Sequence, residues 1–325
     1  MKAWQVHDWC EPDGMRFEDV PLPAPGPGQV RIRNHAVALN FFDLLQIQGK
    51  YQVRPAFPFV PGAEVSGIVD AVNPSVTAVA PGDRVMAMTA AGAYAEYSIA
   101  DSFRTFPIPP EMGWTEAAAM PVVYHTSWFA LVRRAALQPG ETLLVHAGAS
   151  GVGMSAIQIG KALGATVIAT AGDPRKLDFA REQGADHALD YRDPAWAATV
   201  KELTGRRGAD VIYDPVGGDI FDLSTKCIAS EGRLLVIGFA GGRIPSVQAN
   251  RVLLKNISVV GVFWGDYVIS HPWYLGETHF NLEKLYTGGK IRPSVNCVYP
   301  LSDAQRAMRD IAQRNVIGKA VLTVE

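Results

Sequence analysis

The sequence predicts an α/β fold that joins a mainly antiparallel β region to a doubly wound parallel sheet. Up to about Pro121, short apolar runs are separated by Pro and Gly, a pattern typical of antiparallel strands. From about Tyr124, apolar runs alternate with helical patterns, which indicates the βαβ units of a parallel sheet. A strand, a glycine turn and a helix follow one another within residues 141–165, which supports the parallel sheet.

The expected elements follow the chain in order. In the first region, strands are expected at residues 29–33, 67–72 and 84–88. In the second, they are expected at residues 166–170, 210–214, 233–238 and 258–262, the last of them an exposed edge. The final segment is expected to carry helices at 271–286 and 303–313 and an edge-like strand at 320–324.

The glycine turn is the most specific local signal. Residues 143–145 form an apolar strand, Gly148, Gly151 and Gly153 follow at once, and Gly164 is expected to end the helix that comes next. Helix N–H groups and the positive end of the helix dipole face such a turn, which predicts the pyrophosphate site of a dinucleotide. The residues assigned to this site are Gly148, Ala149, Ser150, Gly151, Val152 and Gly153.

Composition and charge limit the classes of function. The chain has 325 residues, of which 48% are hydrophobic, enough for a large core in two domains. A net charge of -2 without basic runs argues against a nucleic-acid partner. No apolar stretch approaches a bilayer span, the start has no signal-peptide core, and Cys10, Cys227 and Cys297 are too dispersed for a disulfide framework. A soluble, cytoplasmic protein without a membrane partner is therefore expected.

Several motifs, in their order along the chain, carry a family resemblance. The spacing at 148–153 is Gly-x-x-Gly-x-Gly, which departs from the common Gly-x-Gly-x-x-Gly. Further motifs are Asn-Phe-Phe-Asp at 40–43, Gly-Lys-Tyr at 49–51, Pro-Gly-Ala-Glu-Val-Ser-Gly at 61–67, Pro-Gly-Asp-Arg-Val at 81–85, Gly-Ala-Tyr-Ala-Glu at 92–96, Gly-Val-Phe-Trp-Gly at 261–265 and Gly-Lys-Ala-Val-Leu at 318–322. With these motifs, nearly the whole chain resembles the medium-chain dehydrogenase/reductase superfamily and, within it, the zinc-free quinone oxidoreductase branch that includes zeta-crystallin.

The resemblance implies a GroES-like, mainly antiparallel catalytic domain into which a Rossmann cofactor domain is inserted. It places the first part of the catalytic domain at residues 1–122, the Rossmann domain at 123–262 and the return to the catalytic domain at 263–325. Family members commonly pair the edge strands of their cofactor domains, so a homodimer with two-fold symmetry is expected through residues 258–262.

No metal site is expected. Alcohol dehydrogenases of the superfamily hold a catalytic zinc with two cysteines and a histidine, but this sequence has Asn40 and Ala63 at two of those positions. It also has no cysteine between Cys10 and Cys227. Without zinc to stabilise an alkoxide, the better substrates are conjugated acceptors, namely quinones and α,β-unsaturated carbonyls.

By resemblance, Asn40 and Tyr51 lie at the substrate end of the site, beside the nicotinamide. Tyr51 is the candidate proton donor or oxyanion-stabilising group, and the alternative is that it only lines an aromatic slot. Asn40 is the candidate hydrogen-bond donor, with helix capping as the alternative, and Asp43 is expected to satisfy neighbouring groups. For the cofactor, the resemblance also assigns Thr126, Gly238, Phe239 and Phe263.

The end of the second parallel strand favours NADPH over NADH. NAD-specific proteins place a carboxylate there, about twenty residues after the glycines, whereas this chain has Gly172. The next residue, Asp173, precedes Pro174 and is expected to be the N-cap of a helix. By resemblance, the residues around the 2′-phosphate of NADPH are Gly172, Lys176, Tyr191, Arg192 and Arg314.

Three functions remain open at this stage. The first is an NADPH-dependent quinone reductase that transfers a hydride directly to a small-molecule acceptor. The second is an enone or enoyl reductase on the same scaffold, and the third is a cofactor-binding protein with little turnover. The fold does not choose among them, because specificity depends on the shape of the pocket.

Overall fold

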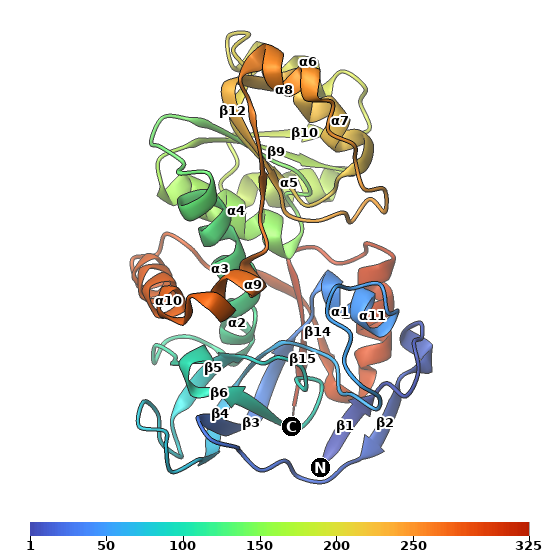
Figure 1. The fold of residues 1–325 in the computed structure, drawn as a ribbon, viewed down its shortest axis with the longest axis vertical. Helices are drawn as coiled ribbons and strands as arrows, with labels where there is room; N and C mark the ends of the chain where they lie inside the picture. The colour runs from blue at the N-terminus through green and yellow to red at the C-terminus, as the bar shows by residue number, and fades with distance from the viewer. Residues whose placement is uncertain (325) are drawn as a thin grey trace. The chain divides into compact units, whose positions relative to one another are not determined.

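The computed structural model describes residues 1–324 and divides the chain into two compact units (Figure 1). Unit 1 contains Met1–Val122 and the residues from Pro293 on, and unit 2 contains Val123–Arg292. Unit 2 is therefore an insertion in the sequence of unit 1.

Residues 263–292 lie in unit 2, whereas the resemblance places the return of the chain at residue 263. This segment forms α9 (Trp264–Ser270) and α10 (Pro272–Thr287). Tyr267 of α9 contacts the ring of Phe129 at 4.8 Å, and His279 of α10 stacks on His125 at 5.6 Å. These ring contacts hold both helices against the start of unit 2, which is why the chain leaves it only at Pro293.

Unit 1 is built on a sheet in the order β14-β15-β3-β4-β5-β7, and β6 pairs with the first half of β3. All of its pairings are antiparallel except β14 with β15. A separate two-stranded sheet holds β1 and β2. The strands are β1 (Lys2–Gln5), β2 (Arg16–Asp19), β3 (Gln29–Ala38), β4 (Glu64–Val72), β5 (Arg84–Met88), β6 (Tyr97–Asp101), β7 (Thr105–Pro107), β14 (Val295–Pro300) and β15 (Lys319–Thr323). The helices are α1 (Phe41–Ile47), α2 (Trp114–Ala118) and α11 (Ala304–Ala312), and α3 (Pro121–Trp128) leads into unit 2.

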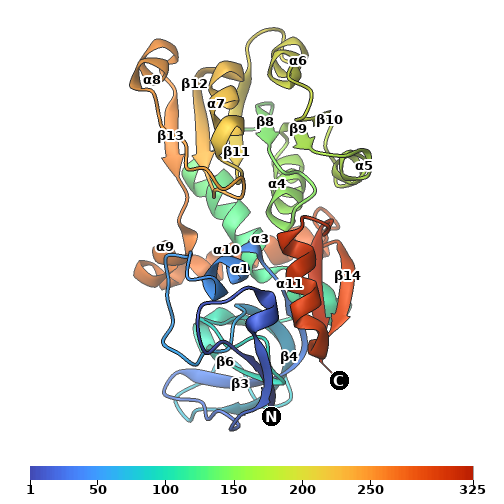
Figure 2. The same cartoon turned by 90° about the vertical axis from the view of Figure 1, so that its right-hand side faces the viewer.

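Unit 2 is a parallel sheet in the order β10-β9-β8-β11-β12-β13, which can be followed across Figure 2. From β8 the chain adds β9 and β10 on one side, and from β11 it adds β12 and β13 on the other, so the direction switches between β8 and β11. The strands are β8 (Thr142–Val145), β9 (Thr166–Ala171), β10 (His187–Asp190), β11 (Ala209–Asp214), β12 (Ile228–Val236) and β13 (Ser258–Gly261). The connecting helices are α4 (Gly151–Ala162), α5 (Pro174–Glu182), α6 (Trp196–Leu203), α7 (Gly218–Cys227) and α8 (Ala249–Lys255).

The predicted fold class is confirmed, because a doubly wound parallel sheet interrupts a mainly antiparallel β unit. β13 lies at the edge of its sheet as expected, but the prediction of an edge at residues 320–324 is wrong. β15 lies between β3 and β14, and its residues are buried on both faces, as an interior strand requires. No strand was predicted at residues 295–300, where β14 lies and where residues alternate between half-buried and exposed. Within residues 1–324, no helix has both the length and the hydropathy to cross a bilayer.

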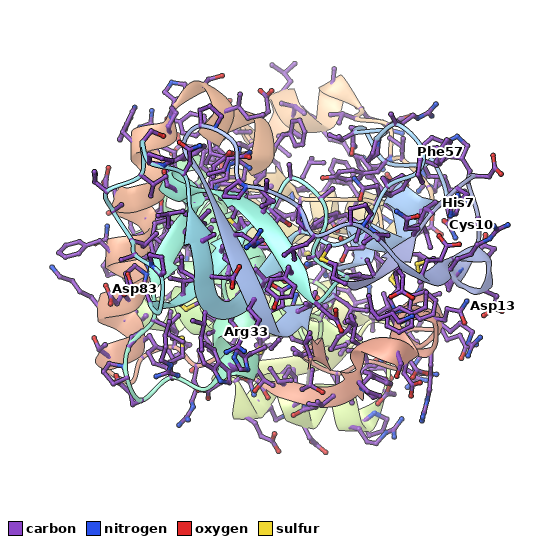
Figure 3. The ribbon with its side chains drawn as sticks, turned by 90° about the horizontal axis from the view of Figure 1, so that it is seen from below. His7, Cys10, Asp13, Arg33, Phe57 and Asp83 are labelled. Atoms are coloured by element: carbon purple, nitrogen blue, oxygen red, sulfur yellow. The ribbon has the colours of Figure 1, made fainter. Side chains whose placement is uncertain are left out.

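A group of aromatic rings holds the loop after β1 against the end of α1. The ring of Trp9 contacts Phe57 edge-on at 4.6 Å, and the N–H of Cys10 donates to the carbonyl oxygen of Ile47 at 2.9 Å. In Figure 3, Cys10 and Phe57 lie on one side of unit 1 and Asp83 on the other. This loop therefore supports the segment that follows α1.

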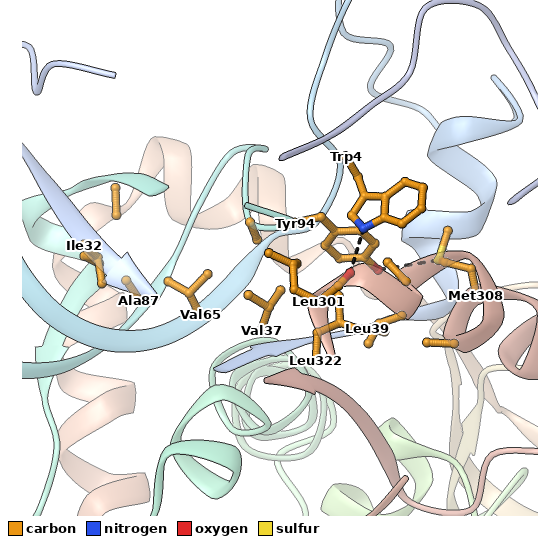
Figure 4. Packing of buried hydrophobic residues seen from close by; sticks show 14 of the residues in the cluster. Trp4, Ile32, Val37, Leu39, Val65, Ala87, Tyr94, Leu301, Met308 and Leu322 are labelled. Carbon is orange, nitrogen blue, oxygen red and sulfur yellow. Dashed lines mark hydrogen bonds between the residues drawn. The ribbon is translucent and has the colours of Figure 1, made fainter. Parts of the chain in front are cut away.

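The core of unit 1 joins residues from the two ends of its sequence (Figure 4). The buried Trp4 donates its indole N–H to the carbonyl oxygen of Leu301 at 2.7 Å. The hydroxyl of Tyr94 contacts Met308 Sδ at 3.5 Å. Sheet residues that complete this core include Ile32, Val37, Val65, Ala87 and Leu322.

Replacing Trp4 by Phe should lower the free energy of unfolding by about 1–3 kcal/mol, because the carbonyl of Leu301 then loses its partner in a buried place. Urea unfolding followed by circular dichroism measures the change. The matched control is Trp273→Phe, since that side chain is 62% exposed. Equal midpoints for the two variants would contradict the structural role of the Trp4 bond.

Candidate active site

The glycine turn after β8 has the geometry that binding of an anion requires. Ser150 is the N-cap of α4, and its Oγ accepts the N–H of Gly153 at 3.1 Å. A Cβ on Gly153 would lie 2.1 Å from the carbonyl oxygen of Ala147, so a larger residue cannot fit there. The N–H groups of Gly151 and Val152 lie in the first turn, where the helix itself supplies no acceptor. These donors, at the positive end of α4, are suited to a phosphate group.

Gly148 and Ala149 keep this turn close to the sheet. The N–H of Gly148 donates to the carbonyl oxygen of Thr170 at 2.9 Å, and a Cβ on Gly148 would lie 2.9 Å from Ala169 Cβ. Ala149 is buried. Gly164 follows α4 with a φ of +85°, as predicted for the residue that ends this helix.

Most cofactor residues expected in unit 2 lie just beyond the carboxyl ends of its parallel strands. The glycine turn follows β8, Gly172 follows β9, Tyr191 follows β10, and Phe263 comes soon after β13. Because these strands are parallel, their carboxyl ends share one edge of the sheet (Figure 2). Ligands of open α/β sheets bind at this edge, beside the switch point.

Gly172 and Tyr191 lie against each other, and Lys176 lies in the first turn of the helix that follows Gly172. A Cβ on Gly172 would lie 2.4 Å from the hydroxyl oxygen of Tyr191, so the tyrosine ring closes directly over the glycine. Asp173 is the N-cap of α5 and accepts the N–H of Lys176 at 3.1 Å, which confirms its predicted structural role. Lys176 Nζ lies 3.6 Å from Asp173 Oδ2, and Arg192 forms an ion pair with Asp190 at 2.7 Å.

Arg314 belongs to unit 1, unlike the other residues expected at the 2′-phosphate. It follows α11, and its φ of +60° lies in the left-handed region. Its part in the site therefore stays a prediction.

Thr126 lies in α3, and the next residue ties this helix to its neighbours. The buried Ser127 Oγ lies 2.8 Å from Ser155 Oγ on α4 and 2.9 Å from the hydroxyl of Tyr213 on β11. The hydroxyl of Tyr124 donates to Gln158 Oε1 on α4 at 2.7 Å. These bonds fix α3 relative to the glycine turn.

Gly238 and Phe239 lie in the segment that follows β12. The N–H of Ala240 donates to the carbonyl oxygen of Pro215 at 3.0 Å, so this segment runs beside the one that follows β11. A Cβ on Gly217 would lie 3.0 Å from Phe239 Cδ1. Phe263 is the N-cap of α9, and its side chain is 51% exposed. It lines a cavity of about 230 Å³ with Phe129 and Tyr267 among other residues.

Tyr51 follows α1 in unit 1, and its ring stacks on Phe42 at 5.3 Å. Burial, and then the charge of Asp43, raise the pKa of the Tyr51 phenol. The phenol therefore keeps its proton at neutral pH and can act as a hydrogen-bond donor.

Beside Tyr51, unit 1 buries a cluster of polar side chains around Asn40. Asn40 is the N-cap of α1, and its Nδ2 donates to Glu64 Oε1 at 2.8 Å. Lys319 Nζ donates to Asn40 Oδ1 at 2.8 Å, to Glu64 Oε1 at 2.5 Å and to the carbonyl oxygen of Leu39 at 2.8 Å. Glu64 Oε2 accepts the N–H of Val122 at 2.7 Å. The Asn40 amide is thus held on both sides.

Asp43, like Glu64, is a fully buried carboxyl group of this cluster. Its Oδ2 accepts the N–H of Asn40 at 2.8 Å and the hydroxyl of Tyr94 at 3.1 Å. Burial raises the pKa of Asp43 to about 7 despite these bonds and the nearby charge of Lys319. This agrees with the expectation that Asp43 satisfies neighbouring groups, since one bond caps its own helix and the other holds the buried hydroxyl of Tyr94.

Lys319 and Glu64 are the members of the cluster for which sequence reasoning found no function. Lys319 lies in the Gly-Lys-Ala-Val-Leu motif, where it begins a strand that is otherwise mainly apolar. A charged residue within a buried strand needs a polar or charged partner. The sequence could therefore have indicated that Lys319 has a buried partner.

Comparisons with known proteins agree with this architecture. The model of the alcohol dehydrogenase GroES-like domain matches residues 26–110, and the model of the zinc-binding dehydrogenase family matches residues 151–276. The chain is 38% identical to quinone oxidoreductase-like protein 2 of Bos taurus, over 95% of this chain and 88% of that protein. It is 35% identical to the quinone oxidoreductase of Pseudomonas aeruginosa, over 99% of each.

Two solved structures are similar over their whole length. A mycobacterial protein in complex with NADPH has a TM-score of 0.94 and 34% identity, covering 99% of this chain and 100% of that one. The CurK enoyl reductase has a TM-score of 0.91 and 25% identity, covering 100% of this chain and 99% of that one.

The residues around Asn40 do not fit a zinc ion, although one matching family model is described as zinc-binding. The amide of Asn40 and the carboxylate of Glu64 are already bonded to the ammonium of Lys319. Ala63 offers no ligand, and residues 1–324 contain no group of three His, Cys, Asp or Glu side chains arranged to hold a metal.

The raised pKa of Asp43 predicts a specific pH dependence of stability. The folded state keeps a proton on Asp43 up to about pH 7, whereas the unfolded chain loses it near 3.8. The contribution of this group is therefore fully present below the unfolded pKa and is lost as the pH rises through 7. Relative to Asp43→Asn, the wild type should lose thermal stability between about pH 4 and about pH 7, with little further loss above that.

Melting temperatures of both proteins across this range measure the effect. The buried imidazoles of His146 and His279, whose pKa values are lowered by burial, contribute equally to both and cancel in the difference. A difference that does not vary with pH would contradict the raised pKa of Asp43.

Proposed function

We propose that this chain, which belongs to the quinone oxidoreductase branch of the medium-chain dehydrogenase/reductase superfamily, is an NADPH-dependent enzyme that reduces a quinone. The observation that carries the proposal is the set of sites at one edge of the parallel sheet. A phosphate-binding turn at α4 lies there together with Gly172, Lys176 and Tyr191, where an NAD-specific protein would have a free carboxylate.

In this proposal, the backbone N–H groups of Gly151 and Val152 bind the pyrophosphate of NADPH. Lys176 and Tyr191 bind the 2′-phosphate, and the engagement of Asp173 as the helix cap, where its Oδ1 accepts the N–H of Lys176, supports this assignment. When bound, NADPH supplies a hydride for the reduction. Thr126, Gly238, Phe239 and Phe263 complete the cofactor site, with Arg314 as a further phosphate ligand.

The acceptor is proposed to bind at Tyr51 and Asn40, which act as hydrogen-bond donors. A carbonyl oxygen gains negative charge as its conjugated system is reduced, and donors placed toward that oxygen lower the barrier. Tyr51 keeps its phenolic proton because burial raises its pKa, and Asn40 has a second N–H beyond the one it gives to Glu64. Donors of this kind suit an acceptor that delocalises charge.

The alternative is reduction of an activated carbon–carbon double bond. The similarity to an enoyl reductase favours it, and so does Tyr51, because an enolate needs a proton donor at its oxygen or carbon. A cofactor-binding protein with little turnover is the third possibility.

The test of the function is a kinetic panel with NADPH. We expect saturable NADPH oxidation with ortho- and para-naphthoquinone, and slower oxidation with α,β-unsaturated aldehydes and enoyl thioesters. Faster turnover of the enones would favour the alternative function. If NADPH binds but is oxidised with none of these acceptors, the third function, a cofactor-binding protein with little turnover, would be favoured.

Tyr51→Phe sharpens the same experiment. If the hydroxyl stabilises an enolate, the variant should lose more turnover on enones than on quinones, because a quinol dianion can collect solvent protons later. Phe42→Leu serves as a control for the loss of ring packing alone. Kinetics of Tyr51→Phe equal to the wild type on both classes would make Tyr51 part of the pocket lining only.

Lys176→Ala should weaken NADPH binding by about tenfold to a hundredfold and leave NADH nearly unchanged, because a charge-assisted hydrogen bond contributes about 1.5–3 kcal/mol. Dissociation constants for both nucleotides, measured by fluorescence, give the comparison. Lys290→Ala removes an exposed lysine of the same unit and should change neither. Wild-type efficiency with NADH equal to that with NADPH, or selective loss of NADH use in Asp173→Ala, would refute the assignment.

We also propose that two copies pair through β13. Among residues 1–324, β12 is the one strand that pairs with β13, so the other edge of β13 has no strand partner. Leu253 and Leu254 of the preceding helix are 76% and 78% exposed. Light scattering at micromolar concentration should give the mass of a dimer. Leu254→Glu should weaken the pairing and shift the measured mass toward that of a monomer. A monomer mass for the wild type would refute this pairing.

A further inference from the structure

The cluster around Asn40 contains an ammonium group whose hydrogen bonds are complete. Lys319 is 2% exposed, and its Nζ has three acceptors at 2.5–2.8 Å, namely the carbonyl oxygen of Leu39, Asn40 Oδ1 and Glu64 Oε1. An ammonium group has three N–H donors, so none is left for a substrate. Lys319 therefore cannot donate to an acceptor molecule, and any influence on the reaction must pass through its partners.

The partners of Asn40 determine which way its amide faces. Lys319 can only donate and the Glu64 carboxylate can only accept, so the amide oxygen must face Lys319 and the amide nitrogen must face Glu64. The reversed amide would place N–H against the ammonium and oxygen against the carboxylate. The network thus leaves one N–H of Asn40 as the group that can still form a hydrogen bond.

We propose that Lys319, together with Glu64, is a positioning residue that fixes the Asn40 amide so that it meets the acceptor oxygen as a donor. This inference rests on the proposed function, in which the acceptor binds at Asn40. The cost of burying two charges is repaid in specificity, since a neutral pair of the same size would let the amide turn over and present its oxygen instead. An amide oxygen would repel the oxygen of the acceptor as charge develops on it.

The pair is tested by removing both charges together, because removing one would leave the other buried and unpaired. The variant is Lys319→Met with Glu64→Gln, and its folding is checked by circular dichroism and melting temperature. The matched control is Lys2→Met with Asp19→Asn, an exposed ion pair of the same unit at 2.6 Å. A third variant, Asn40→Ala, removes the amide itself.

With NADPH and para-benzoquinone, we expect the buried-pair variant to lose about tenfold or more in kcat/KM, carried mainly by kcat, while the dissociation constant for NADPH changes less than twofold. The control pair should behave as the wild type. The single variant Lys319→Arg keeps a cation that can only donate, so its kcat/KM should lie between those of the buried-pair variant and the wild type.

The decisive measurement is whether the effects of the pair and of Asn40 overlap. Asn40→Ala should lower kcat/KM about tenfold in the wild type but less than twofold in the buried-pair variant, because the amide is already misoriented there. The inference would be overturned if Asn40→Ala lowered kcat/KM by the same factor in the wild type and in the buried-pair variant. It would also be overturned if the buried-pair variant folded and had the kcat/KM of the wild type.

Binding of the product hydroquinone, measured by calorimetry, gives the same comparison without turnover. If the wild type reduces no acceptor but binds hydroquinone in a way that depends on Asn40 and the pair together, the proposed function fails and the positioning role stands. If hydroquinone binds equally to all variants, the positioning role fails whatever the turnover.

Discussion

The buried ammonium of Lys319 is the charge on which the polar interior of unit 1 depends. It lies at the start of β15, opposite Glu64 at the start of β4 and Asn40 just before α1, and it bonds to both side chains. Taking two charges out of water costs several kcal/mol per ion, and only close pairing with complete hydrogen bonding offsets that cost. These three chain segments must therefore keep their register, since a shift in any of them would leave a buried charge without its partner.

The same constraint limits the chemistry of the unit. With Lys319 committed to three acceptors and Glu64 to three donors, neither is available as an acid or a base. The Asp43 carboxyl of α1 is buried and bonded to Asn40 and Tyr94. The donors that remain near α1 are the Tyr51 phenol, which keeps its proton, and one amide N–H of Asn40. Such donors can hydrogen-bond an oxygen that becomes negative, which supports the proposal of a conjugated acceptor.

Sequence by itself determined the features in which neighbouring residues interact. The strand, glycine turn and helix at 141–165 were predictable because their hydrogen bonds and close contacts join residues a few positions apart, such as Ser150 with Gly153. The Asp173 cap follows from its place before Pro174 and its bond to Lys176 in the first turn. The doubly wound sheet followed from the alternation of strands and helices, and the assignment of the cofactor residues depended on the family resemblance added to these local patterns.

Only the tertiary structure decided the contacts between distant segments. Lys319 and Asn40 are separated by 279 residues, and no spacing in the sequence shows that they meet. β15 is an interior strand because β14 pairs with its outer edge. α10 belongs to unit 2, where His279 stacks on His125. Local periodicity records which faces of an element are apolar, but the partner that covers a face is selected by packing the whole chain. A charged residue in a buried strand, such as Lys319, shows this most clearly. The residue type indicates that an oppositely charged or polar partner is needed, but the sequence does not indicate which residue that partner is.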